Sequence, residues 1–118
     1  MLAKEKMKFY VAIHRPEAFD HSAEITQEVM DNINRVNEEM VAAGVRVFVG
    51  GLQSRTQAKT IHRAPSGELS VSDGPLQETK EYVDGFWVLE VASVEEAVEW
   101  GKKAAAACRG SVEVRPFH

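Results

Sequence analysis

Alternation of apolar and polar residues predicts six short β-strands. In residues 8–14, Phe9, Val11 and Ile13 fall on one face of a strand, and Tyr10 and His14 fall on the other. Five further segments have the residues that strands favour and are bounded by glycine, proline or polar turns. These segments are residues 45–49, 58–63, 68–72, 84–91 and 111–115.

Apolar residues at helical spacing interrupt these strands at two places. In the first place they recur every three or four positions, which predicts one buried stripe of a helix, with Gly44 just past its end in the left-handed conformation. The members of this stripe are Ile25, Val29, Ile33, Val36 and Met40. The second helix begins at Ser93, which forms a capping box with Glu96, and ends at Gly110. Its buried stripe consists mainly of small residues, so it can lie close to a sheet.

The order of elements is strand, helix, strand, short hairpin, strand, helix, strand. This order predicts an α+β domain of the ferredoxin-like type, a βαββαβ antiparallel sheet with an inserted β-hairpin. The strand pattern starts after residue 7, so residues 1–7 are predicted to be a leader and residues 8–118 a single domain. Pro16 should end the first strand, because proline cannot donate to a ladder, and a polar loop over 16–22 follows.

The second face of the predicted sheet is also apolar. Two helices cover only one face of a four-stranded sheet, and a wet outer face should carry polar residues at alternate positions. The pattern instead predicts Tyr10, Ala12, Trp87 and Leu89 on an exposed face. A homodimer that packs sheet against sheet would bury them. The alternative is a monomer with an ordinary, half-apolar outer face.

Composition and charge narrow the functional classes. The chain has 118 residues, of which 44% are hydrophobic and 27% are charged, the balance of one folded domain. A formal net charge of −4 argues against general nucleic-acid binding, although a local basic site could bind a small anion. The single cysteine, Cys108, fits a reducing compartment. The sequence contains no run of about 20 apolar residues that could span a membrane, and its N-terminus lacks the apolar stretch of a signal peptide. These two observations predict a cytoplasmic protein.

A nine-residue segment carries a resemblance to a known family. It reads Asp-Gly-Pro-Leu-Gln-Glu-Thr-Lys-Glu over residues 73–81, with Gly85 and Phe86 after it. It resembles the signature of YCII-related proteins of the DGPF type, with Leu76 where phenylalanine is usual. The similarity extends over nearly the whole chain from about Met7. It implies a dimeric α/β barrel of ferredoxin-like subunits. It also implies suspected enzymes with a His–Asp pair, and an association with extracytoplasmic-function sigma factors.

His14 and Asp73 are the predicted catalytic pair. His14 ends the first strand on the predicted inter-sheet face, where it could act as a general acid or base. Asp73 could orient the imidazole from the start of the motif turn, which Gly74 and Pro75 form. Each residue also has a simpler interpretation. His14 could be a strand-end histidine bonded to backbone or water, and Asp73 could accept hydrogen bonds from its own turn.

Four residues are predicted to bind substrate: Lys80, Glu78, Arg115 and Tyr10. Lys80 and Arg115 could each meet an anionic substrate, but either could equally form a surface ion pair of small energetic value. No organic cofactor motif is present, so no cofactor is predicted.

Metal binding has weak support in the sequence. Potential ligands cluster in the first loop at His14, Glu17, Asp20 and His21, without the spacing of a known metal motif. Such a loop is more often simply solvated, and no metal site is predicted.

Two functional hypotheses follow. The first is a small-molecule enzyme of the isomerase, lyase or cofactor-free oxygenase type, with its site in a cleft at the dimer interface. The second is a non-catalytic ligand-binding or regulatory module linked to sigma-factor signalling. Polar groups converging in a cavity would favour the first hypothesis, and a flat apolar surface would favour the second.

Overall fold

The computed structural model of the chain describes residues 5–76 and 79–118. Six strands, three α-helices and one short 3-10 helix (η1) are found in these residues. The strands are β1 Met7–Pro16, β2 Arg46–Gly51, β3 Lys59–Arg63, β4 Leu69–Asp73, β5 Glu81–Val91 and β6 Ser111–Pro116. The helices are α1 His21–Glu24, α2 Gln27–Ala42, η1 Arg55–Gln57 and α3 Val94–Cys108.

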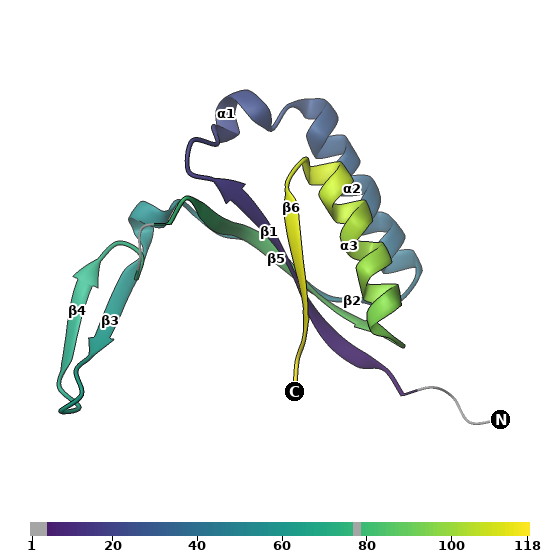
Figure 1. Cartoon of the computed structure of the whole chain (residues 1–118). Helices are drawn as coiled ribbons and strands as arrows, with labels where there is room; N and C mark the ends of the chain where they lie inside the picture. The colour runs from purple at the N-terminus through teal and green to yellow at the C-terminus, as the bar shows by residue number, and fades with distance from the viewer. Residues whose placement is uncertain (1–4, 77–78) are drawn as a thin grey trace.

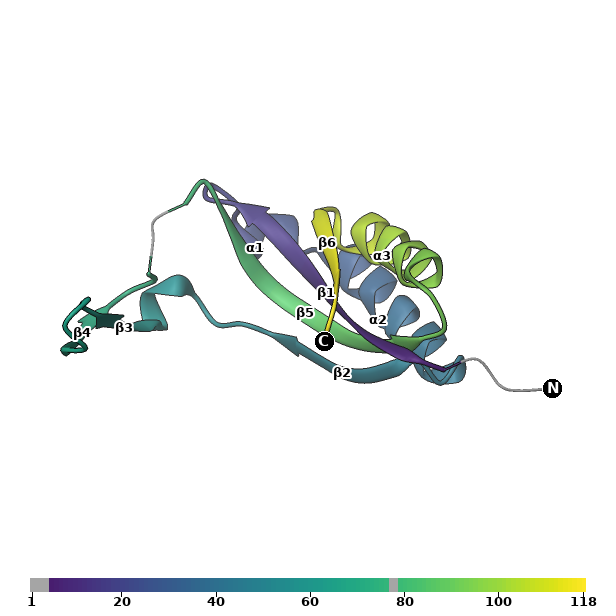
Figure 2. The same ribbon diagram turned by 60° about the horizontal axis from the view of Figure 1, so that its bottom comes forward.

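Four strands form an antiparallel sheet in the order β2-β5-β1-β6. The predicted mixed α+β class is therefore confirmed, and the sheet is compatible with a ferredoxin-like fold. The strands β3 and β4 pair with each other in a separate two-stranded sheet. This small sheet projects away from the main body, as both ribbon views show (Figures 1 and 2).

The helices α2 and α3 lie together on one face of the four-stranded sheet (Figure 2). The hydrophobic core fills the space between these two layers. Its centre comes from β1 and β5, where Phe9 is paired with Leu89 and Val11 with Trp87. All four of these side chains are buried. Small residues of α3, such as Ala97 and Ala104, are also buried, which agrees with a helix that approaches the sheet closely.

The prediction that Trp87 and Leu89 lie on an exposed face is wrong. Residues directly opposite each other in an antiparallel pair project to the same face. Because Trp87 is opposite Val11, it points toward the helices, and its indole Nε1 donates to Asn37 Oδ1 at 2.8 Å. The side chains on the outer face include Tyr10, Phe48, Phe86 and Val88. Ala12 is on this face as predicted, but it is buried and not exposed. Alternation within β5 is visible in the sequence, but the pairing with β1 decides which face is the inner one.

The helix ends follow the predicted capping chemistry, with one difference at each end of α3. Ser93 caps the helix, and the Glu96 carboxylate accepts from the backbone N–H of Ala92, one residue before the usual partner. Arg109, not Gly110, adopts the left-handed conformation at the other end, with φ 54°. Gly110 is required for space, because a Cβ there would lie 2.8 Å from Arg15 Nη1. Gly44 has the predicted positive φ of 69°.

The first strand and loop also differ from expectation. β1 ends at Pro16, as predicted, but it extends two residues beyond the predicted strand 8–14, and Pro16 pairs with Glu81 of β5. The pairing of β1 with β6 stops at His14, so the other side of Pro16 needs no backbone donor. The short helix α1, His21–Glu24, begins inside the predicted polar loop 16–22 and is capped by the Asp20 side chain. The side-chain hydroxyl and the backbone N–H of Ser22 both donate to the Asp20 carboxylate, and these hydrogen bonds lower the pKa of Asp20.

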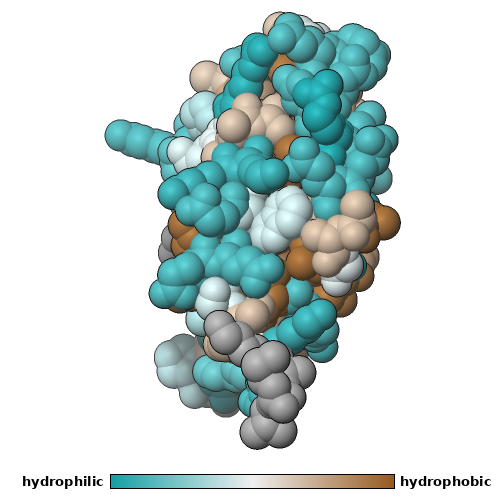
Figure 3. Space-filling model, turned by 90° about the vertical axis from the view of Figure 1, so that its right-hand side faces the viewer, coloured by the Kyte–Doolittle hydropathy of each residue, from teal (hydrophilic) through white to brown (hydrophobic). Residues whose placement is uncertain are grey.

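The side of the molecule that carries α2 and α3 is mainly hydrophilic, with a few hydrophobic residues among the polar ones (Figure 3). None of the helices in the described part of the chain is long and apolar enough to cross a membrane.

Replacing Trp87 by glutamate should unfold the domain. The change places an unpaired carboxylate in the core, and we expect the free energy of unfolding to fall by more than about 4 kcal/mol. Chemical denaturation followed by circular dichroism measures this loss. The matched control is Val94→Glu, which adds the same charge at an exposed position in the first turn of α3 and should leave stability nearly unchanged. A folded Trp87→Glu variant of near-normal stability would contradict the placement of Trp87 in the core.

Candidate functional site

Arg15 is a buried cation at the end of the core. It continues the inward-facing series of β1 after Phe9, Val11 and Ile13, and its side chain is only 2% exposed. Its Nη1 donates to the carbonyl oxygens of Cys108 at 2.6 Å and of Arg109 at 3.3 Å, at the C-terminal end of α3. A helix C-terminus carries partial negative charge and carbonyl oxygens without intrahelical partners, so this cation supplies the missing hydrogen-bond donors at the end of α3.

Asp84 supplies the carboxylate that neutralises Arg15. Its Oδ2 accepts from Arg15 Nε at 3.4 Å. Simple alternation would place Asp84 on the outer face with Phe86. A β-bulge prevents this, because Ile13 pairs with Gly85 and the next residue, His14, pairs with Val83. Asp84 is the extra residue of the bulge, which turns its side chain toward Arg15.

His21 is the third member of the cluster. From the start of α1, its Nε2 lies 2.7 Å from Asp84 Oδ1. Phe19 holds the ring from the side through an edge-to-face contact with a centroid distance of 4.9 Å. The same phenyl ring lies 4.2 Å from the Arg15 guanidinium carbon. One carboxylate thus joins a buried guanidinium to an imidazole that is 52% exposed and open to ligand.

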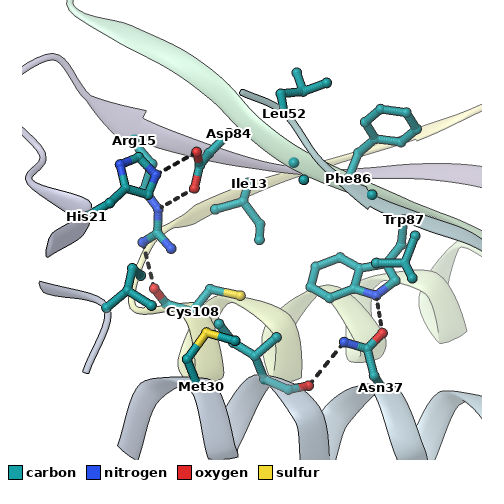
Figure 4. A pocket seen from close by; sticks show the side chains of 16 residues that line it. Ile13, Arg15, His21, Met30, Asn37, Leu52, Asp84, Phe86, Trp87 and Cys108 are labelled. Carbon is teal, nitrogen blue, oxygen red and sulfur yellow. Dashed lines mark hydrogen bonds and ion pairs between the residues drawn. The ribbon is translucent and has the colours of Figure 1, made fainter. Parts of the chain in front are cut away.

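The cluster lies at the edge of an apolar cavity of about 290 Å³, between the sheet and α2 (Figure 4). Its apolar wall comes from the sheet, α2 and the segments that flank them: Ile13, Ile25, Met30, Ile33, Val49, Leu52 and Trp87. Phe86 also borders the cavity, but its ring points away from the helices, toward the outer face of the sheet (Figure 4). Asn37 adds an amide that is held by the Trp87 indole. An apolar cavity with a few convergent polar groups is the usual form of a small-molecule site.

A second cavity of about 340 Å³ lies on the other side of the cluster. It shares His21, Leu52 and Asp84 with the first cavity, and its other lining residues are mostly polar or aromatic, including Arg55 and Tyr82. The His21–Asp84 pair therefore stands where an apolar and a polar cavity adjoin.

The hydrogen bond to Asp84 determines which nitrogen of His21 is available for chemistry. An ionised carboxylate only accepts hydrogen bonds, so the His21 Nε2–H donates to Asp84. In the neutral ring the lone pair is then on Nδ1. An imidazole held in this way by a carboxylate can accept and return a proton. Cys108 also lines the first cavity, but burial raises the pKa of its thiol to about 11, so it is not a nucleophile near neutral pH.

Three of the predicted site residues lie on the outer face of the main sheet. His14 is half-buried there, and its Nε2 is buried without a hydrogen-bond partner among the described residues. Tyr10 is opposite Arg115 of β6 and contacts Phe86 with a ring-centroid distance of 5.4 Å. Arg115 forms an ion pair with Glu113 at 2.7 Å, which raises the pKa of Arg115 and lowers that of Glu113.

The predicted residues of the motif lie in a different part of the chain. Asp73 ends β4, is 83% exposed and forms an ion pair with Lys59 of β3. Gly74 has a φ of 93°, and its carbonyl accepts from the Thr60 hydroxyl at 2.6 Å. Lys80 is exposed just before β5.

Pro75 and Gly74 line a shallow cavity next to Arg55. Glu78 lies outside the described residues. Within the described chain, His14 and Asp73 share no hydrogen bond or ion pair.

The sequence analysis did not predict the three residues that form the site as catalytic or substrate-binding residues: Arg15, Asp84 and His21. Two sequence signals point to them. Arg15 occupies an inward-facing position of the β1 pattern, and a charge at a core position requires a buried partner. Gly85 follows Asp84 inside a strand, where glycine often marks a bulge. His21 gives a weaker signal, since it appeared only as one potential ligand in a loop. In residues 5–76 and 79–118, no group of three or more potential metal ligands is gathered.

The fold and the site together define a small α+β protein with a His–Asp–Arg cluster between two cavities. A model of the YCII-related domain matches residues 7–118, and the chain therefore belongs to this family. The chain is also similar to an uncharacterised protein of Rhizobium meliloti (strain 1021). The two are 38% identical over 98 residues, which cover 81% of this chain and 78% of the relative.

Removing Arg15 should destabilise the domain more than removing both charges of the pair. Arg15→Met leaves the Asp84 carboxylate without its buried partner, and we expect a loss of about 3–5 kcal/mol in the free energy of unfolding. The double variant Arg15→Met/Asp84→Leu removes the orphaned charge and should recover part of that loss. Chemical denaturation of the wild type, the two single variants and the double variant measures the coupling. Strictly additive effects would show that the two residues do not interact.

Proposed function

We propose that this protein is a small-molecule enzyme that transfers protons with His21, oriented by Asp84. The observation that carries the proposal is the 2.7 Å contact between His21 Nε2 and Asp84 Oδ1 at the border of an apolar cavity. Arg15 keeps the carboxylate in place, and the half-exposed imidazole borders both cavities. Isomerases and lyases that move a proton at carbon use a positioned base, and a carboxylate that orients the base, beside a cavity for the substrate.

The convergence of polar groups favours an enzyme over a purely regulatory module. A module that only binds a protein partner, such as one linked to sigma-factor signalling, needs an exposed surface but no oriented histidine. Here an imidazole, a carboxylate and a buried guanidinium meet in one place. The narrower assignment to the DGPF type rests on the motif at residues 73–81 and on its Gly85–Phe86 continuation.

The proposal includes a homodimer formed through the outer face of the main sheet. Three aromatic rings lie together on this face, with centroid distances of 5.4 Å between Tyr10 and Phe86 and 5.7 Å between Phe48 and Phe86. In the described residues no helix covers them. A second copy would bury this patch and the unpartnered Nε2 of His14, as in a dimeric α/β barrel. The pairing of His14 with Asp73 stays a prediction for that dimer.

Proton transfer can be tested without knowing the natural substrate. The wild type should catalyse exchange of hydrogen for deuterium at the carbon next to a carbonyl group, in a panel of small keto acids and ketones in D₂O followed by NMR. His21→Gln removes the base, and Asp84→Asn leaves the ring without its orienting carboxylate. We expect each variant to lose about 10²- to 10⁴-fold in exchange rate.

The matched control for this experiment is His62→Gln. His62 is an exposed histidine of β3 that forms a hydrogen bond with the Ser72 hydroxyl and lines neither cavity, so its replacement should not change the rate. Exchange that persists at the wild-type rate in His21→Gln would contradict the assigned base. Exchange that is absent from the wild type across the whole panel would contradict proton transfer at carbon.

The dimer should depend on the aromatic patch and not on the core. Phe48 is 52% exposed, so Phe48→Glu should leave the circular dichroism spectrum intact while it introduces a charge into the interface. Sedimentation equilibrium should give twice the monomer mass of 13.1 kDa for the wild type, and the monomer mass for the variant. A wild-type mass near that of the monomer at micromolar concentration would exclude the dimer.

A further inference from the structure

Arg55 lines the polar cavity next to the His–Asp pair, and it also lines the shallow cavity at Gly74 and Pro75. Arg55 is half-buried at the start of η1, with its guanidinium carbon 4.5 Å from the centre of the Tyr82 ring. Its Nη1 makes one long hydrogen bond of 3.4 Å, to the carbonyl of Thr79. In residues 5–76 and 79–118, no carboxylate lies within ion-pair distance of it. An arginine stacked on an aromatic ring is pre-organised, and its planar fork matches a carboxylate.

We infer that the substrate is an organic acid with one carboxylate and an apolar body. The carboxylate binds Arg55 in the polar cavity, and the apolar body occupies the cavity between the sheet and α2. This inference rests on the proposed function, because it names the class of molecule on which His21 acts. It follows from the shared lining of the two cavities: a ligand that spans both has its middle beside His21 and Asp84.

The charges around the polar cavity select a monoanion. Glu17 lines this cavity together with Arg55, and the Asp84 carboxylate lies at its border. Asp84 is already neutralised by Arg15, and His21 adds a hydrogen-bond donor to it. Arg55 can therefore pair with one carboxylate of the ligand, whereas a phosphate with two charges would add a second negative charge beside Glu17 without a second cation among the described lining residues.

Arg55 could instead serve only to stabilise the segment between β2 and β3 by stacking on Tyr82. The two roles differ in a measurable way. A structural arginine would change stability, but it would not make the protein prefer an acid over the neutral amide of the same shape. The preference for acid over amide is therefore the quantity to measure.

The experiment uses phenylacetate and 3-phenylpropionate as probes, each compared with its neutral amide, by NMR titration and calorimetry. A charge-assisted hydrogen bond contributes about 1.5–3 kcal/mol, so the wild type should bind each acid roughly 10- to 100-fold more tightly than its amide. Arg55→Gln should abolish this preference, and Arg55→Lys should restore part of it. Arg63→Gln removes the same charge from an exposed position in β3 that lines neither cavity, and it should keep the full preference.

Failure of the inference and failure of the proposed function are distinguishable. His21→Gln should lose deuterium exchange but keep the preference for acids, since the base and the anion subsite are separate. Equal binding of acid and amide by the wild type, an unchanged preference in Arg55→Gln, or no binding of either acid would overturn the carboxylate subsite. If exchange were fast on neutral ketones and insensitive to Arg55→Gln, the subsite would be wrong while His21 kept its role.

Discussion

The burial of the Arg15 guanidinium is the constraint on which the site depends. A cation removed from water costs several kcal/mol unless charges and hydrogen bonds replace the lost hydration. Here the replacement comes from the Asp84 carboxylate, the carbonyls of Cys108 and Arg109 at the end of α3, and the face of Phe19. Each partner belongs to a different segment of the chain. Arg15 therefore holds β5, the end of α3 and the loop after β1 in one arrangement.

This arrangement also fixes the orientation of His21. Asp84 is held on one oxygen by Arg15 and presents the other to His21. The bulge in β5 makes this possible, because it turns a side chain of the outer series toward the inner face. Gly85, beside the bulge, lets β2 approach closely, since a Cβ there would lie 2.9 Å from the Gly50 carbonyl oxygen. One wall of the apolar cavity is formed where β2 and β5 come together, at Gly50, Gly51 and Gly85.

The same fold supports many unrelated activities, so membership of the YCII-related family does not by itself define the reaction. The site is more informative than the fold, because any reaction there must use the side chains that line it. It contains a histidine with an oriented ring, a neutralised carboxylate and two cavities of opposite character. The rings of Tyr10, Phe48 and Phe86 lie on the outer face of the sheet, whereas the Arg15 side chain points toward the end of α3 on the inner face. The proposed proton transfer and the proposed homodimer therefore depend on different residues of the protein.

Much of the fold was predictable from local pattern, because strands and helices bury one face at a fixed period. The alternation around Phe9 and Val11, the stripe ending at Met40 and the Ser93 cap each led to an element that the structure contains. The site was not predictable in the same way, since its members are 6 and 63 residues apart in the chain: Arg15 precedes His21, and Asp84 follows His21. The position of Asp84 depends on one extra residue in the pairing of β5 with β1, and the inner face of β5 depends on the same register. Register is a property of two strands together, so only the tertiary structure could bring Asp84 to His21 and turn Trp87 into the core.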